Sequence, residues 1–487
     1  AQHGWERYTS QTRPSLSAHD GYRSGYRGKR GATLERLTDL DAALLAAETS
    51  NQHVHVIATL VLDMTGSTES AYQVVLQRMR ERFAMVPLLR QRLQTVPFAP
   101  PVWVEEEKVE LEAHVHRAVL PNAGGIDAIA PLVGEVASRS LPRDRPMWEA
   151  LVIEGLDDNR AALVIKVHHS LVDGVSGIAS LVPFFDLEPS PVDSPLADTW
   201  EAPLAPTPAE LAKETLAELR RRPGEIARAT GRVVGSVVGA ARAGAGAPLP
   251  MAGPRVVWND ALTPRRSVAF TDIGVDQVKS IRAAFGGTVN DVVVALVAGS
   301  LHRYLAARGE LPDRALVAAV PTSERAPEHG LAGNRLSMML YGLPVHLDDP
   351  LDRLDEVARS AELAKALYDQ AGVGLFASVA SMVPLPVIAP VMRTFSRLGL
   401  ARRLPPVANV IVSNVRGPGF PLYAAGATLE HMLPIGPLME GVGLGVTVVS
   451  YRDHIDFGFL TCPDLVPDVG AMAAGIKTDL DALLALV

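Results

Sequence analysis

Two apolar runs joined by a short polar turn restrict most strongly what this chain can fold into. Residues 149–155 read Glu-Ala-Leu-Val-Ile-Glu-Gly, and residues 161–167 read Ala-Ala-Leu-Val-Ile-Lys-Val. Both runs have the length and the β-forming residues of buried strands. The turn-forming residues 157–160, Asp-Asp-Asn-Arg, lie between them and predict a β-hairpin. The second strand leads directly into His168 and His169, so two histidines are placed where a core strand meets a loop.

The two histidines begin the sequence His-His-Ser-Leu-Val-Asp-Gly, which ends at Asp173 and Gly174. Successive side chains of a strand point to opposite faces, so we expect one histidine to face a cleft and the other to be structural. Asp173 followed by Gly174 predicts a tight turn whose carboxylate fixes the loop. A neutral imidazole held by a neighbour is a suitable general base near pH 7.

The residues alone leave other interpretations of His168 and His169 open. A buried histidine is often only a hydrogen-bonded core residue. Histidine and aspartate are also metal ligands. However, neighbouring strand side chains diverge and no further Cys/His cluster with ligand spacing is present, so we expect no metal here. The full seven-residue pattern is more specific than any one of its members.

Composition narrows the class of protein. The 487 residues allow two or three domains, and the net charge of -8 argues against a nucleic-acid partner. The single cysteine, Cys462, excludes an intrachain disulfide and fits a reducing compartment, and we expect it to be a buried thiol. Residues 1–33 are polar, rich in Gly, Arg, Tyr and Ser, and lack a signal-peptide apolar region, which predicts a flexible basic arm.

Changes of pattern divide the rest of the chain. Alternating strand and helix patterns over residues 34–185 predict an α/β domain that carries the histidine motif. Residues 186–262 begin with a proline-rich segment and continue with helical patterns, which predicts a linker and connecting helices. Residues 263–487 predict a second α/β domain with a long apolar helix over 292–307 and a hairpin over 443–462. Thr288 or Asn290 can cap that helix.

One stretch has the length of a membrane span. Residues 371–392 contain no charged side chain, but their prolines would interrupt a continuous helix, so no transmembrane span is predicted. Four arginines follow: Arg393, Arg397, Arg402 and Arg403. An interfacial membrane segment and ordinary core helices are both open alternatives for this region.

The order of several short motifs resembles one family. Besides HHSLVDG, they are PMW at 146–148, TVND at 288–291, VPTSER at 320–325, GNRLS at 333–337 and SNVRGP at 413–418. Over nearly all of residues 34–487 the chain resembles bacterial wax ester synthase/acyl-CoA:diacylglycerol acyltransferases, within the HHxxxDG superfamily of CoA-dependent acyltransferases. The family usually has Leu where this chain has Met147, which is a mild departure.

The resemblance implies a fold and an activity. The fold would be α/β, with two chloramphenicol acetyltransferase-like domains in a pseudo-twofold arrangement and a tunnel at their interface. A long-chain acyl group would pass from acyl-CoA to diacylglycerol or a fatty alcohol, giving triacylglycerol or wax ester. Acyl-CoA would be a co-substrate and no cofactor is expected. The protein would be cytoplasmic and associated peripherally with a membrane or lipid inclusions.

The resemblance also assigns roles to residues. His169 would be the general base and His168 a supporting residue. Asp173 would point away from the cleft and be held by a cation. The candidate cations are Arg90 and Arg92, and the candidate donors to the oxyanion are Ser413, Asn414 and Asn290. From the residues alone, the arginines can equally be solvated, Asn290 can only cap its helix, and Asn414 can only shape a turn.

Three alternative functions are considered. A related acyltransferase or condensation enzyme would use an amine or a carrier-protein thioester, but no carrier domain is attached and the SNVRGP segment is present. A non-catalytic lipid-binding protein of the same fold is a second alternative, which the intact His169 and Asp173 disfavour. A metal-dependent hydrolase is the third.

Overall fold

The computed structural model describes residues 35–96, 99–106, 108–172, 174–189, 250–323, 336–371 and 385–487. The predicted arm and most of the predicted linker lie outside these residues, so the domain boundaries stay predictions. The described helices are α2 (Asp39–Ala47), α3 (Ala71–Arg82), α4 (Ala130–Ala137), α5 (Gly174–Leu181), α7 (Val275–Phe285), α8 (Val289–Ala307), α9 (Pro350–Ala371), α11 (Leu385–Arg397) and α12 (Val469–Leu484).

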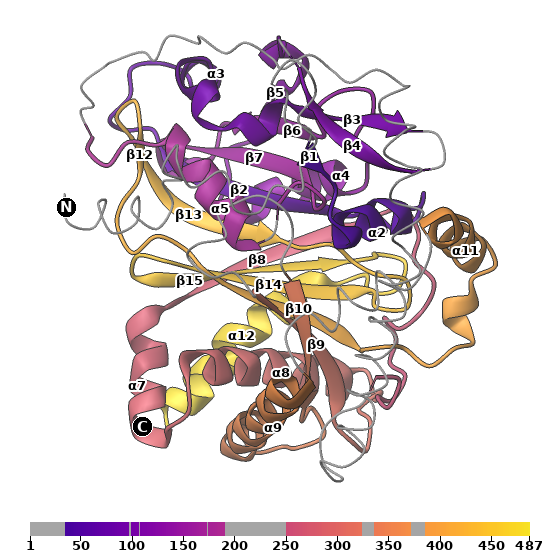
Figure 1. Cartoon of the computed structure of the whole chain (residues 1–487). Helices are drawn as coiled ribbons and strands as arrows, with labels where there is room; N and C mark the ends of the chain where they lie inside the picture. Colours follow the sequence, from indigo (N-terminus) through magenta and orange to yellow (C-terminus); the bar gives the residue numbers. More distant parts are fainter. Residues whose placement is uncertain are drawn as a thin grey trace.

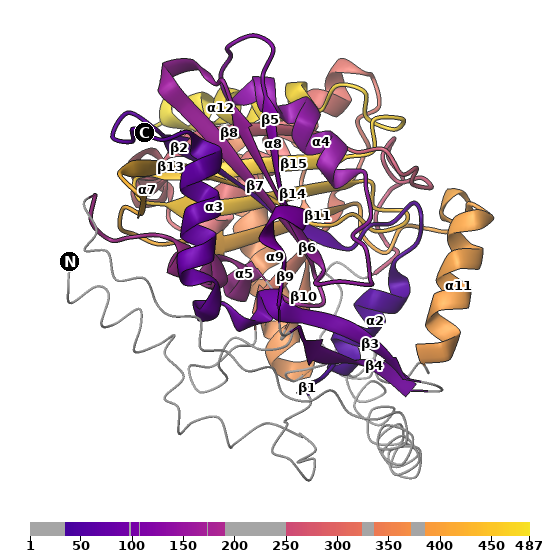
Figure 2. The same cartoon turned by 90° about the horizontal axis from the view of Figure 1, so that it is seen from above.

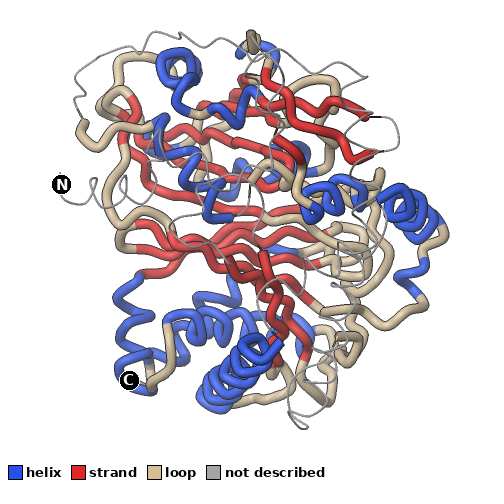
Figure 3. Tube along the Cα trace, viewed as in Figure 1, coloured by secondary structure: helices blue, strands red, loops and turns tan. Residues whose placement is uncertain are grey.

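The strands form three sheets within the described residues (Figures 1 and 3). In spatial order, the N-terminal sheet contains β12 (Tyr423–Ala424), β13 (Ala427–Ile435), β2 (His55–Asp63), β7 (Arg160–His168), β6 (Trp148–Glu154) and β5 (Val115–Val119). The C-terminal sheet contains β10 (Leu336–Leu343), β9 (Leu316–Ser323), β11 (Val410–Arg416), β14 (Leu444–Tyr451), β15 (His454–Thr461) and β8 (Ser267–Gly274). A small sheet contains β1 (Glu35–Arg36), β4 (Ala99–Glu105) and β3 (Gln91–Val96). The predicted α/β class with two related halves is confirmed.

The predicted hairpin is confirmed as β6 and β7, which pair antiparallel. Asp158 and Asn159 lie between them with φ of 57° and 54°, and these residue types tolerate the left-handed region well. Strand β7 is central, between β2 and β6, and all its residues except Arg160 are buried. Burial on both faces explains why the sequence of this strand is continuously apolar.

The N-terminal sheet is completed by residues from the far end of the chain. Strand β13 pairs antiparallel with β2, with Thr428 opposite Asp63 and Ile435 opposite Ile57. Figure 1 shows β13, in orange, beside the indigo β2. Residues 427–435 belong to the second half of the sequence. Hydrophobic patterning does not reveal that they complete the sheet of the first half. The two halves are therefore connected through a shared sheet as well as through packing.

Helices cover the face of the C-terminal sheet that points away from the other half (Figure 1). The central one, α8, is buried along most of its length, in agreement with the predicted apolar helix. Thr288 caps it: its hydroxyl accepts a hydrogen bond from Asp291 N at 3.2 Å, and its own N–H donates to the Asp291 carboxylate at 2.8 Å. Asn290 is therefore not the cap, and its side chain is available for another role.

Helix α11 lies at the outer edge of the molecule, packed beside α2 (Figures 1 and 2). Its Ser396 hydroxyl accepts a hydrogen bond from Asn51 Nδ2 at 3.3 Å. In the part of the chain that the structure describes, no single helix has both the length and the apolar character needed to cross a membrane. Only α7 and α8 together reach that length and composition, and a 100° bend separates them.

Candidate active site

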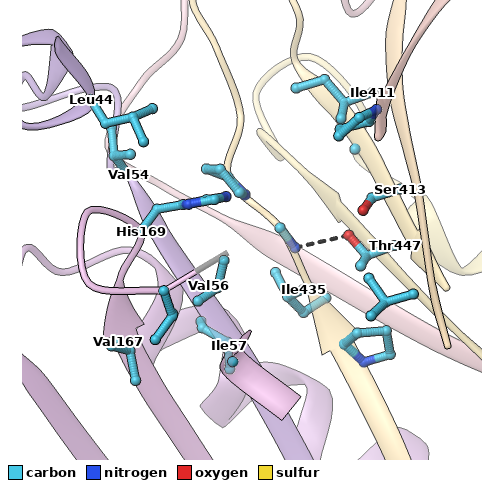
Figure 4. Close-up of a pocket in the computed structure, with 18 of the residues that line it drawn as sticks. Leu44, Val54, Val56, Ile57, Val167, His169, Ile411, Ser413, Ile435 and Thr447 are labelled. Atoms are coloured by element: carbon cyan, nitrogen blue, oxygen red, sulfur yellow. Dashed lines mark hydrogen bonds between the residues drawn. The ribbon is translucent and has the colours of Figure 1, made fainter. Parts of the chain in front are cut away.

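A cavity of about 970 Å³ lies between the two halves, lined by residues of both six-stranded sheets and of the helices α2, α5, α8 and α11. Most of its lining is aliphatic, for example Ile57, Val167, Ile411 and Ile435 (Figure 4). Among the described residues that line it, polar side chains are a minority. A large apolar cavity with a few polar groups is typical of a site for a small molecule.

His169 follows the last residue of β7 and lines this cavity. Its backbone N–H donates to Val54 O at 2.9 Å, which anchors the end of β7 to the segment before β2. His169 continues the alternation of side chains along β7, because Val167 and Ile165, two and four residues earlier, line the same cavity. In Figure 4 the imidazole of His169 projects into the cavity toward the wall that carries Ser413 and Thr447.

His168 lies on the other face and is 1% exposed. Its Nδ1 accepts a hydrogen bond from Ser170 N at 3.1 Å and lies 2.7 Å from the Ser170 hydroxyl. Burial lowers the pKa of His168 to about 3, so the ring is neutral at pH 7. A neutral ring that accepts at Nδ1 carries its proton on Nε2, and this nitrogen faces Glu48 Oε2 at 3.8 Å.

Glu48 is the centre of a buried polar group that the sequence analysis missed. His55 Nε2 lies 3.1 Å from one of its oxygens, and Arg143 donates to the other at 2.6 Å. Burial acts to raise the pKa of Glu48, but its contacts with His55 and His168 and the hydrogen bond from Arg143 outweigh it and hold that pKa well below its usual value. A signal was available in His55, a polar residue in an apolar strand, which lies opposite His168 in the β2–β7 register.

The three predicted oxyanion donors line the same cavity as His169. Ser413 and Asn414 belong to β11, and Asn290 lies in the first turn of α8. Asn414 Nδ2 donates to Asn290 Oδ1 at 3.2 Å. Thr447 of β14, which the sequence analysis did not name, also lines the cavity, and its hydroxyl accepts from Gly436 N at 3.0 Å. Polar donors from the second half are therefore brought to the cavity that His169 enters.

The remaining predicted residues surround the motif. Asp173 lies outside the described residues, so its partner stays a prediction, and Gly174 begins α5. Arg90 is 2% exposed, with its guanidinium carbon 4.9 Å from the centre of the Phe83 ring. Arg92 pairs with Glu106, Nε to Oε1 at 2.5 Å. Arg90 is thus buried, and Arg92 has a carboxylate partner on the neighbouring segment.

Comparisons with known proteins agree with this architecture. The model of the wax ester synthase/diacylglycerol acyltransferase catalytic domain matches residues 37–293, and that of the WS/DGAT C-terminal domain matches residues 332–484. A Mycobacterium tuberculosis protein named as a diacylglycerol O-acyltransferase is 32% identical over 464 residues, 93% of this chain and 91% of that protein. A second one is 33% identical over 465 residues, 92% of this chain and 99% of that protein.

Solved structures give the same result. The wax ester synthase/diacylglycerol acyltransferase from Marinobacter aquaeolei VT8 is similar with a TM-score of 0.68 and 27% identity, over 93% of this chain and 99% of that chain. The first condensation domain of the calcium-dependent antibiotic synthetase shares the fold, with a TM-score of 0.56, 17% identity and coverage of 93% and 97%. The chain belongs to the wax ester synthase/diacylglycerol acyltransferase family and is an acyltransferase.

Proposed function

We propose that the protein transfers a long-chain fatty acyl group from acyl-CoA to the hydroxyl of diacylglycerol or a fatty alcohol, giving triacylglycerol or wax ester. One observation carries this proposal: a large aliphatic cavity holds a histidine opposite hydroxyl and amide groups. Aliphatic walls suit acyl chains, and the polar groups suit the reacting centre. The names of the Mycobacterium and Marinobacter relatives support the same pair of reactions.

In this reaction His169 takes the proton of the alcohol as its oxygen attacks the thioester carbonyl. The carbonyl oxygen becomes an oxyanion, which donors from the facing wall stabilise; Asn414, Asn290 and Ser413 are the proposed donors. The C–S bond then breaks, and the proton on His169 passes to the departing thiolate of CoA. The ester and free CoA leave, and no covalent enzyme intermediate and no further cofactor are needed.

The buried neighbours of His169 have a positioning role in this proposal. His168 and Glu48 lie behind the end of β7, where their contacts hold the strand against β2. Asp173 fixes the loop that follows, with a cation as its partner. Rigid support of this kind keeps a general base within reach of the proton it removes.

An assay with several acceptors tests the function. The protein is incubated with labelled palmitoyl-CoA and, separately, with a diacylglycerol, hexadecanol and hexadecylamine. Labelled triacylglycerol or wax ester is the expected product. Amide as the main product would instead indicate a condensing enzyme, and lipid binding without any product would indicate a lipid-binding protein.

Peripheral membrane association is part of the proposal, because both acceptors dissolve in lipid. Helix α11 borders the cavity through Ile388, Val391 and Met392; Val391 is also 54% exposed, and Leu398, just after the helix, is 65% exposed. The four arginines that follow Met392 are exposed on or just after this helix. Apolar side chains at a lipid interface, next to cations that meet anionic headgroups, would bring the cavity to its substrates.

Replacing Arg393, Arg397, Arg402 and Arg403 by Gln tests this docking. Each arginine near an anionic surface contributes about 1 kcal/mol, so binding to anionic liposomes should weaken strongly, most of all at low ionic strength. Activity on a short, soluble alcohol should persist, which controls for folding. Sedimentation with anionic liposomes equal to that of the wild type would exclude this surface.

A further inference from the structure

Three ionisable side chains meet where the two halves pack together, away from the cavity. His431 lies on β13 of the N-terminal sheet, and His454 and Asp456 lie on β15 of the C-terminal sheet. One possible ligand atom from each lies within 4.8 Å of the others. His431 Nδ1 is 2.8 Å from Asp456 Oδ1, and His454 Nε2 is 3.6 Å from Asp456 Oδ2. None of the three lines the central cavity.

The carboxylate of this cluster is fixed in place. Asp456 is fully buried, and its Oδ2 accepts a hydrogen bond from Met432 N at 2.8 Å. A buried carboxylate is costly unless a cation or hydrogen-bond donors compensate it. The Nδ1 of His431 is hydrogen-bonded to Asp456 Oδ1 at 2.8 Å, and the ring centres of His431 and His454 lie 4.7 Å apart.

In one neutral tautomer, His454 directs an electron pair at the carboxylate. Its Nδ1 lies 3.2 Å from Asp453 Oδ1 and donates to it in the tautomer that carries its proton on Nδ1. Its Nε2 is buried and makes no hydrogen bond to the described residues. A neutral ring would then place the Nε2 lone pair 3.6 Å from a carboxylate oxygen, which is unfavourable unless a cation lies between them.

We propose that His431, His454 and Asp456 bind a divalent transition-metal ion of the zinc type, with water as the fourth ligand. Zinc binds nitrogen and oxygen at about 2.0–2.2 Å in tetrahedral geometry, which separates neighbouring ligand atoms by about 3.3 Å. His431 Nδ1 and His454 Nε2 lie at 2.8 Å and 3.6 Å from different oxygens of Asp456, so the carboxylate would turn to offer one oxygen to the ion. The Asp453 carboxylate on Nδ1 of His454 is the outer partner that zinc-binding histidines usually have.

The surroundings suit a cation that enters from solvent. The histidine side chains are 18% and 16% exposed, so the cluster lies close to the surface, although His454 Nε2 and Asp456 are buried. Asp272 lies opposite Asp456 in the β8–β15 register and adds a further negative charge, although Lys477 pairs with it at 3.2 Å. Because the ligands come from both sheets, the ion would cross-link the two halves of the molecule. This role is structural and independent of acyl transfer.

The experiment uses the full-length chain after removal of any purification tag and treatment with a chelator. Titration with Co²⁺ should give the visible absorption of a tetrahedral site at one equivalent, and Zn²⁺ should displace it and raise the thermal midpoint. His454→Gln should weaken Zn²⁺ binding by more than about 100-fold, since even the loss of an outer partner costs about 10- to 100-fold. His116→Gln, at an exposed histidine of β5, is the matched control and should bind as the wild type does.

The result that would overturn the proposal is equal Zn²⁺ affinity in the wild type and His454→Gln, or no tetrahedral cobalt absorption in the wild type. The cluster would then be only a protonated His–Asp pair. A circular dichroism spectrum for each variant separates a lost site from a lost fold. Since His454 is partly exposed, its substitution leaves the buried Asp456 and its contact with Met432 in place.

Discussion

Two adjacent histidines have opposite environments in this protein. His169 enters the cavity, whereas His168 is buried beside Ser170 and Glu48. Burial keeps His168 neutral in the folded protein, and it thereby makes the free energy of unfolding depend on pH. An unfolded histidine takes up a proton below about pH 6.5, but His168 has its pKa lowered to about 3 by burial, so protons favour the unfolded chain between these values.

We therefore predict that the free energy of unfolding decreases as the pH falls from 7 to 5. His168 contributes up to about 1.4 kcal/mol per pH unit to this slope, and His53, with its pKa lowered to about 4, adds to it. Urea denaturation of the wild type and of His168→Gln at pH 7, 6 and 5 measures the effect. In the variant, the number of protons taken up on unfolding should be smaller by about one, so its free energy of unfolding should depend less on pH, whatever its absolute stability. An unchanged slope would show that His168 takes up its proton in the folded state.

At the residue scale, the sequence predicted which side chains line the cavity better than it predicted those behind them. His169, Ser413, Asn414 and Asn290 lie in motifs or at strand and helix ends, where local patterns are informative. Glu48 could not be found in this way, and the local signal of His55, a polar residue in an apolar strand, does not identify its partner. His55 meets His168 because β2 pairs with β7 in one particular register, and residue periodicity does not specify a partner strand.

At the scale of elements, β13 shows the limit of local patterning most clearly. Its polar residues Glu430 and His431 interrupt the apolar run, and its partner β2 lies near the other end of the chain. The hairpin of β14 and β15 was predicted, because its strands are apolar and adjacent in sequence. A glycine on β15 lets the backbone of β13 come close. A Cβ on Gly458 would lie 1.8 Å from the backbone oxygen of Pro434 on β13.

Gly458→Ala is therefore expected to be strongly destabilising. The obstructing atom belongs to the backbone of β13, which β2 holds in the N-terminal sheet, so it cannot move aside cheaply. Overpacking typically costs about 1–3 kcal/mol, and we expect at least the upper part of this range. Thermal or urea denaturation measures it. Gly419→Ala, where an added Cβ meets nothing within 4 Å, is the control and should change stability by less than about 0.5 kcal/mol. Equal stability of the two variants would contradict the described crossing of β13 and β15.

At the scale of the whole molecule, the apolar cavity depends on both halves of the chain. The α/β class followed from the alternation of strands and helices, whereas the pairing of two halves around a site came from the family resemblance. Hydrophobic patterns can identify a strand, but they do not place β11 opposite the end of β7. The central claim is that this placement puts one general base, His169, among donors from the other half.

The most direct measurement of this claim is the rate of acyl transfer by His169→Ala, with palmitoyl-CoA and the acceptor that the wild type uses best. The rate should fall by about 100- to 10,000-fold, the usual contribution of a general base. The thermal midpoint and the binding of a non-hydrolysable acyl-CoA analogue should change little. His116→Ala, at an exposed position on β5, should retain the wild-type rate. A folded His169→Ala variant that transfers acyl groups as fast as the wild type would contradict the account.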